Sequence, residues 1–142
     1  MKSYQNLLQL LAINSKTNTE LGGANIEGTK KAVMFIQELI KELPLKWTEI
    51  KKDNVSSFWY AETIINDPTK PTILISSHID TVYSAKDIVV KETSNKIYGS
   101  GAQDMKGSVY AICEILKKLH AKKQLRNLIF YISPQEETAT LD

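Results

Sequence analysis

Residues 72–83 read TILISSHIDTVY, and this stretch gives the strongest indication of the fold of the chain. Its opening run, Thr72–Ile75, predicts a buried strand, because short apolar runs are typical of strands inside a sheet. The strand leads into His78 and Asp80, and side chains two residues apart on a strand share a face. A neutral imidazole is a common metal ligand, and a neighbouring carboxylate fixes its tautomer. We therefore expect a functional pair at the end of this strand.

Two later segments place more acidic residues in comparable positions. Residues 98–107, YGSGAQDMKG, put Asp104 between a glycine-rich loop and a helix start, where an acid can also serve as an N-cap. Residues 127–137, NLIFYISPQEE, put Glu136 and Glu137 directly after an apolar strand. Each acid or imidazole thus follows a strand or precedes a helix. Open α/β sheets build their sites at such positions.

Hydrophobic periodicity predicts an α/β chain with one core. Ser3 is expected to cap the first helix, Pro44 to end the second, and residues 53–54 to form a turn. A small hairpin is expected about Ser94 and Asn95. The chain shows no internal repeat and no interdomain linker. The predicted helices are 3–13, 27–43 and 105–120, and the predicted strands are 45–52, 58–64, 72–75, 88–91, 96–98 and 127–132.

Composition narrows the classes of function. The chain has 142 residues, 42% of them hydrophobic and 24% charged, and a net charge of +2, so nothing favours a nucleic-acid or membrane partner. No apolar run approaches the ~20 residues of a membrane span, and the N-terminus has no secretory signal pattern. The single cysteine, Cys113, falls at helical spacing with apolar neighbours and is expected in the core. These features favour a cytoplasmic protein.

The segments SSHIDTVY, IYGSGAQDMKGSVYAICEILKKL and NLIFYISPQEE resemble the di-zinc aminoacylase and carboxypeptidase family. That family includes glutamate carboxypeptidase, acetylornithine deacetylase and succinyl-diaminopimelate desuccinylase, and the glutamate carboxypeptidase branch looks closest. The resemblance covers essentially the whole chain. It implies a three-layer αβα zinc-peptidase-like domain that is incomplete at its C-terminus. Residues 1–142 would be the N-terminal part of the metal-binding catalytic domain, without the dimerisation domain and the C-terminal part.

The resemblance also implies a role for each site residue. His78 would bind one zinc ion, Glu137 the other, and Asp104 would bridge the two ions, which lie roughly 3.5–4 Å apart in such sites. Glu136 would be the general base, and Asp80 would orient the imidazole. Lys106 and Gly107 would shape the loop and the helix start. A complete subunit would hold two Zn²⁺, although Co²⁺ or Mn²⁺ also suit these ligands.

The expected function is hydrolysis of an amide bond in a small peptide or an N-acyl amino acid, by a protein that is a homodimer when complete. The family needs a further acidic ligand and a C-terminal histidine, and this chain contains neither. Each zinc would then have two protein ligands here, whereas catalytic zinc normally has three. We therefore expect the 142-residue chain alone to be inactive. The alternative is a truncated, inactive remnant or a non-enzymatic interaction domain.

Two nucleotide-binding alternatives fit the sequence poorly. A dinucleotide fingerprint would use Gly99 and Gly101 and would need a third glycine near position 104. Asp104 stands there and would repel a pyrophosphate. A phosphate-binding P-loop requires Gly-Lys followed by Ser or Thr, and this sequence has no such triplet.

Overall fold

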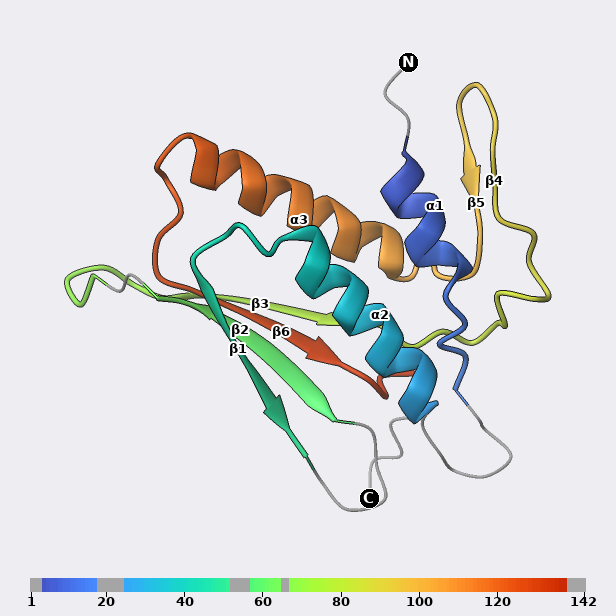
Figure 1. Cartoon of the computed structure of the whole chain (residues 1–142), viewed down its shortest axis with the longest axis horizontal. Coiled ribbons are helices and arrows are strands. Elements are labelled where there is room, and N and C mark those ends of the chain that lie inside the picture. The colour runs from blue at the N-terminus through green and yellow to red at the C-terminus, as the bar shows by residue number, and fades with distance from the viewer. Residues whose placement is uncertain (1–3, 18–24, 52–56, 65–66, 138–142) are drawn as a thin grey trace.

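The structure, a computed structural model, describes residues 4–17, 25–51, 57–64 and 67–137 (Figure 1). The chain contains both helices and strands, as the hydrophobic periodicity predicts, and the α/β class is confirmed. The elements, in chain order, are α1 (Gln5–Ala12), α2 (Ile26–Leu39), β1 (Leu45–Ile50), β2 (Phe58–Thr63), β3 (Ile73–His78), β4 (Lys91–Glu92), β5 (Ile97–Tyr98), α3 (Lys106–Ala121) and β6 (Leu128–Ser133).

Four strands form a mixed sheet in the order β1-β2-β6-β3, while β4 and β5 form a separate hairpin. The pairs β1–β2 and β2–β6 are antiparallel, and β3 runs parallel to β6. The parallel pair is in register from Ile73 opposite Leu128 to His78 opposite Ser133. Since parallel strands end at the same edge of a sheet, the carboxyl ends of β3 and β6 meet there.

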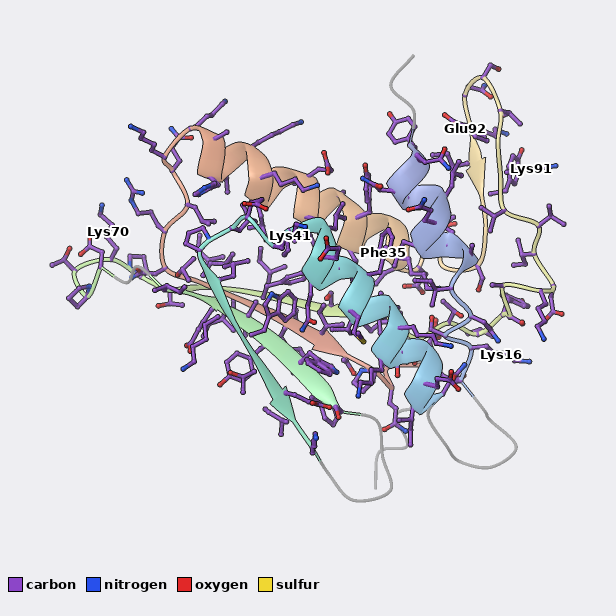
Figure 2. All side chains as sticks on the ribbon, in the orientation of Figure 1. Lys16, Phe35, Lys41, Lys70, Lys91 and Glu92 are labelled. Carbon is purple, nitrogen blue, oxygen red and sulfur yellow. The ribbon has the colours of Figure 1, made fainter. Side chains whose placement is uncertain are left out.

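Helices α2 and α3 pack on one face of this sheet (Figure 1). Val33 and Ile36 of α2, with Val109 and Cys113 of α3, share a buried core with Phe130 of β6. Burial raises the pKa of the Cys113 thiol to about 12, which agrees with the predicted core role and not with a nucleophile. Further core side chains are Ala32, Ala61, Leu116, Leu128 and Ile132. Phe35 packs against the same core, whereas Lys41, Lys70 and Lys91 extend from exposed positions (Figure 2).

The opposite face of the sheet carries aromatic and aliphatic side chains. Phe58 and Tyr131 stack there, with ring centroids 6.1 Å apart, and Leu74 of the edge strand β3 is 65% exposed. Within the described residues the helices supply one layer over the sheet, and no helix covers this second face. The described part is therefore a helical layer on a mixed sheet. None of its helices is long and apolar enough to cross a membrane.

Several boundaries differ from the sequence-based expectation. The second helix ends at Leu39 and not at 43, because the chain turns at Ile40 and Leu43 is buried in that turn. The strand expected at 72–75 continues to His78, because its ladder with β6 continues that far. The prediction that Asp104 could cap α3 is wrong. Met105 holds the N-cap position and no side chain caps the helix. Ser3 and the turn at residues 53–54 lie outside the described residues.

Candidate metal centre

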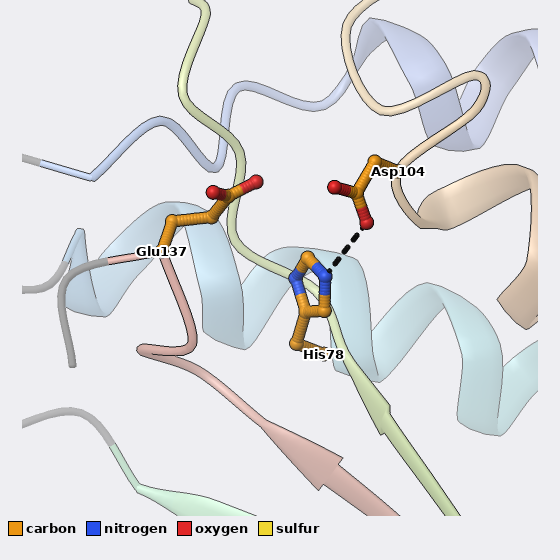
Figure 3. Close-up of side chains that lie close together, drawn as sticks. All are labelled: His78, Asp104 and Glu137. Atoms are coloured by element: carbon orange, nitrogen blue, oxygen red, sulfur yellow. Dashed lines mark hydrogen bonds and ion pairs between the residues drawn. The ribbon is translucent and has the colours of Figure 1, made fainter.

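Three predicted ligands converge at the edge where β3 and β6 end (Figure 3). His78 is the last residue of β3, Asp104 lies in the loop before α3, and Glu137 follows β6. One ligand atom from each lies within 4.8 Å of the other two. Nitrogen and carboxylate oxygen donors at this spacing match the ligand chemistry of zinc, cobalt or manganese. The donor set therefore fits the metal that the sequence predicts.

The local backbone explains why these side chains meet. The parallel register brings the residues that follow Ser133 beside His78. The Asp104 loop is tied to the same place, because the His78 N–H donates a hydrogen bond to Met105 Sδ at 3.2 Å. The peptide bond between Asp104 and Met105 is cis. The site thus draws on two strand ends and one helix start.

His78 lies between two carboxylates. Its Nε2 is 3.0 Å from Asp104 Oδ1, and its Nδ1 is 3.3 Å from Asp80 Oδ1. Burial is the largest influence on its pKa and favours the neutral ring. The hydrogen bonds to Asp80 and Asp104, together with the charges of Asp80 and Glu136, outweigh burial and raise the pKa of His78 to about 9. Without a metal the imidazole is therefore held in its charged form at neutral pH.

Asp80 has a second set of contacts that sequence reasoning missed. Its carboxylate is fully buried. Oδ1 accepts a hydrogen bond from the Glu136 N–H at 3.1 Å, and Oδ2 accepts one from the Glu137 N–H at 2.9 Å. Asp80 therefore faces the imidazole and also holds the loop that carries both glutamates. No pattern in the sequence indicates this contact, because it joins residues 56 and 57 positions apart.

The two glutamates occupy different environments. The Glu136 side chain is 60% exposed, and its Oε2 lies 3.9 Å from His78 Nε2. Burial, followed by the negative charge of Asp104, raises the pKa of the Glu137 carboxyl. Acidic groups this close repel one another, and a cation among them would offset that repulsion. This electrostatic arrangement suits a site built to hold a positive ion.

Lys106 and Gly107 hold the Asp104 loop, the role expected of them from the sequence. The Lys106 side chain is fully buried, and its Nζ donates a hydrogen bond to the Ile13 carbonyl at 2.5 Å. Burial lowers the pKa of this amine to about 8. A Cβ on Gly107 would lie 2.1 Å from the Ala102 carbonyl oxygen, so only glycine fits there. Both residues fix the path of the chain next to Asp104.

Comparison with known proteins finds sequence similarity to one peptidase family. Residues 74–141 match the model of peptidase family M20/M25/M40. An acetylornithine deacetylase from Buchnera aphidicola subsp. Acyrthosiphon pisum (strain 5A) is 35% identical over 72 residues, which cover 46% of this chain and 19% of the relative. The acetylornithine deacetylase of Aliivibrio fischeri (strain MJ11) is 26% identical over 144 aligned residues, covering 97% of this chain and 36% of the relative.

Solved structures share the fold. Human carnosine dipeptidase 1 superposes with a TM-score of 0.80 at 21% identity, over 96% of this chain and 32% of its own. The M20 family metallo-carboxypeptidase Sso-CP2 from Sulfolobus solfataricus superposes with a TM-score of 0.73 at 23% identity. This match covers 96% of this chain and 31% of Sso-CP2. The matches thus span 19% to 36% of the length of these proteins. Residues 74–141 thus resemble peptidase family M20/M25/M40 in sequence, and the chain shares its fold with solved structures that include an M20 family metallo-carboxypeptidase.

Proposed function

We propose that this chain is the N-terminal part of the catalytic domain of a zinc-dependent hydrolase that cleaves an amide bond in a small peptide or an N-acyl amino acid. The observation that carries this proposal is the convergence of His78, Asp104 and Glu137 at one edge of the sheet, with Glu136 beside them. The coverage of the relatives supports the partial extent, since the chain matches 36% of one acetylornithine deacetylase.

In this proposal His78 and Glu137 would each hold one metal ion, and Asp104 would be a ligand shared by both. Zinc, when bound, polarises the scissile carbonyl and lowers the pKa of the attacking water. Glu136 accepts the proton of that water and delivers it to the leaving amine, a role that suits an exposed carboxylate beside the ligands. Asp80 orients His78 and, through the backbone of Glu136 and Glu137, the loop that carries the base. Co²⁺ or Mn²⁺ would suit the same ligands.

The number of ligands favours a second candidate for the isolated chain. Among the described residues, the metal-ligand cluster contains three side chains, and a catalytic zinc ion by itself normally uses three. A pair of ions would need further ligands. The second candidate is therefore an inactive remnant or a non-enzymatic interaction domain. Under the first candidate, the complete protein is a cytoplasmic homodimeric enzyme.

Metal content and turnover test both candidates. The complete protein should retain about two zinc ions per subunit after dialysis and release amine from a dipeptide or from N-acetylornithine. The 142-residue chain should bind zinc weakly and turn nothing over. Tight binding of two zinc ions by the short chain would contradict the ligand assignment. Absence of hydrolysis in the metal-loaded complete protein would favour the remnant.

A further inference from the structure

A cleft adjoins the candidate metal centre and has no role in the chemistry described so far. Its volume is about 460 Å³. One wall is the loop of residues 81–83 after β3, and the other is formed by Ile97, Tyr98 and the glycine-rich loop up to Asp104. Asp104 and Glu137 line the same cleft, so it opens on the metal ligands themselves. Anything bound in the cleft would lie next to the reacting groups.

Among the described residues, the lining of this cleft is more apolar than polar and lacks cationic side chains. Val82, Tyr83, Ile88, Ile97 and Tyr98 contribute its apolar surface. Val82 is 47% exposed and Tyr83 62% exposed. The part of the lining that the structure describes contains no lysine, arginine or histidine, and its charged side chains are Asp104 and Glu137. Since those two carboxylates are assigned to the metal, the remainder of the described lining offers a charged group no side chain of opposite charge.

Hydrogen bonds hold the walls of the cleft in place without a ligand. Thr81 Oγ1 donates to the Tyr83 carbonyl at 2.9 Å, and the buried Ser100 hydroxyl donates to the same carbonyl. The Ala102 N–H donates to the Gly99 carbonyl at 3.1 Å. The Ser100 bond links the loop after β3 to the glycine-rich loop, and the other two bonds each lie within one of the loops. Preformed pockets with an apolar lining and few polar groups are typical of small-molecule sites.

We propose that this cleft is the subsite for an uncharged, apolar side chain of the substrate, beside the amide bond that is cleaved. The inference rests on the proposed hydrolase function and adds the class of side chain that the site accepts. A carboxylate placed there would lose its hydration and gain no cation, and a lysine would find only carboxylates already neutralised by metal. A leucine-sized group would bury apolar surface against Val82 and Tyr83.

Competing dipeptides test the preference. The zinc-loaded complete protein is assayed on six dipeptides, in which alanine occupies one position and leucine, glutamate or lysine the other, in both orders. At one of the two positions leucine should exceed glutamate and lysine by about tenfold or more in kcat/KM. A preference for a charged residue at both positions would overturn the inference.

Tyr83→Lys provides the decisive variant, because this exposed side chain at the cleft can change without disturbing the core. It should lower the ratio of leucine to glutamate at that position by about tenfold or more. Ile64→Lys makes a similar charge change at a 67% exposed residue just after β2, at the opposite end of the sheet, and should leave the ratio as it is. An equal effect of both variants, or no effect of Tyr83→Lys, would overturn the inference.

A binding measurement separates this inference from the proposed function. Amide NMR signals of Val82, Tyr98 and Gly99 are followed while N-acetyl-L-leucine or N-acetyl-L-glutamate is added. The leucine probe should shift these signals and the glutamate probe should not. Equal shifts, or none from the leucine probe, would overturn the cleft assignment whatever the turnover. Selective leucine binding without turnover of any dipeptide would instead reject the hydrolase function alone.

Discussion

The carboxylate of Asp80 accepts a hydrogen bond from the backbone N–H of Glu137 at 2.9 Å. Its other oxygen accepts from the Glu136 N–H and faces the His78 imidazole. One buried acid therefore links the loop after β3 to the loop after β6. Two amide donors and a charged imidazole offset the cost of burying its charge, which would otherwise be high. The three contacts indicate that the glutamate pair is positioned even before a metal binds.

Replacing Asp80 with Asn should weaken its contact with His78 and its hold on the loop that carries Glu136 and Glu137. The Asn side chain keeps the shape but has one acceptor oxygen, so one glutamate N–H loses its partner. Zinc affinity should fall about 10- to 100-fold, and the free energy of unfolding should fall by about 1–3 kcal/mol. Calorimetric zinc titration and urea unfolding measure these changes. Asp87→Asn, the same change at an exposed residue, is the control, and an equal effect there would contradict the prediction.

The stability of the metal-free protein should depend on the charge of His78. Its pKa of about 9 lies above the ordinary value of 6.5, so the folded state binds the proton more tightly. The stability that the protonated His78 adds to the folded state is fully present below about pH 6.5. It is lost as the pH rises to about 9, by up to about 1.4 kcal/mol per pH unit. Urea unfolding at several pH values tests the slope. His78→Gln should flatten it, and an unchanged slope would refute the assignment.

Zinc affinity should show the opposite pH dependence. A metal ligand must be a neutral imidazole, so binding displaces the proton that Asp80 and Asp104 help to hold on His78. Apparent affinity should therefore rise by up to tenfold per pH unit between pH 6.5 and about 9, and then level off. Competition with a chelator of known pH dependence measures this. A flat profile would mean that His78 is not a ligand.

Two substitutions separate the general base from the bridging ligand. Glu136→Gln should reduce kcat of the complete protein about 10²-fold or more, while zinc content stays near two per subunit. Asp104→Ala should lower the affinity of both metals together, because Asp104 alone is assigned to both. Elemental analysis beside steady-state kinetics distinguishes the two. Loss of one zinc in Glu136→Gln would reassign that residue as a ligand.

Gly107→Ala should destabilise the protein, although alanine favours helices. In an open helix the change stabilises by about 1 kcal/mol. Here the added Cβ would meet the Ala102 carbonyl oxygen at 2.1 Å, so the Asp104 loop must move, at a cost of about 1–3 kcal/mol. Ser108→Ala, one position along at an exposed site, should change stability little. Thermal unfolding of both variants shows whether each change raises or lowers the stability of the protein.

The 142-residue chain alone should self-associate through the edge strand β3 and the sheet face that none of the described helices covers. Leu74 is 65% exposed on β3, which ends the sheet order. Exposed apolar surface and unpaired strand edges both favour association. Sedimentation at micromolar concentration should show oligomers, and Leu74→Lys should shift them toward monomer. A monomeric, cooperatively unfolding chain would contradict this expectation and favour an independent domain.

The sequence by itself determined the order of the elements and the ligand candidates. Apolar periodicity carries local information, and it located α3 and β6 to within a residue or two. The alternation of His78 and Asp80 indicated that their side chains would meet, and the structure brings them to 3.3 Å. The pattern extended the second helix four residues too far, because apolar Ile40 and Leu43 continue its spacing into a buried turn.

Only the tertiary structure decided which distant groups face one another. The register of β3 against β6 brings Glu137 to His78, and the Asp104 loop reaches them from the start of α3. The same packing aligns Asp80 with two backbone amides and sets Lys106 against the Ile13 carbonyl, 93 positions away. Such contacts depend on how elements pack in space, and short-range periodicity holds no information about them. The cleft lined by Tyr83 and Tyr98 arises in the same way, from two loops that are separate in the sequence.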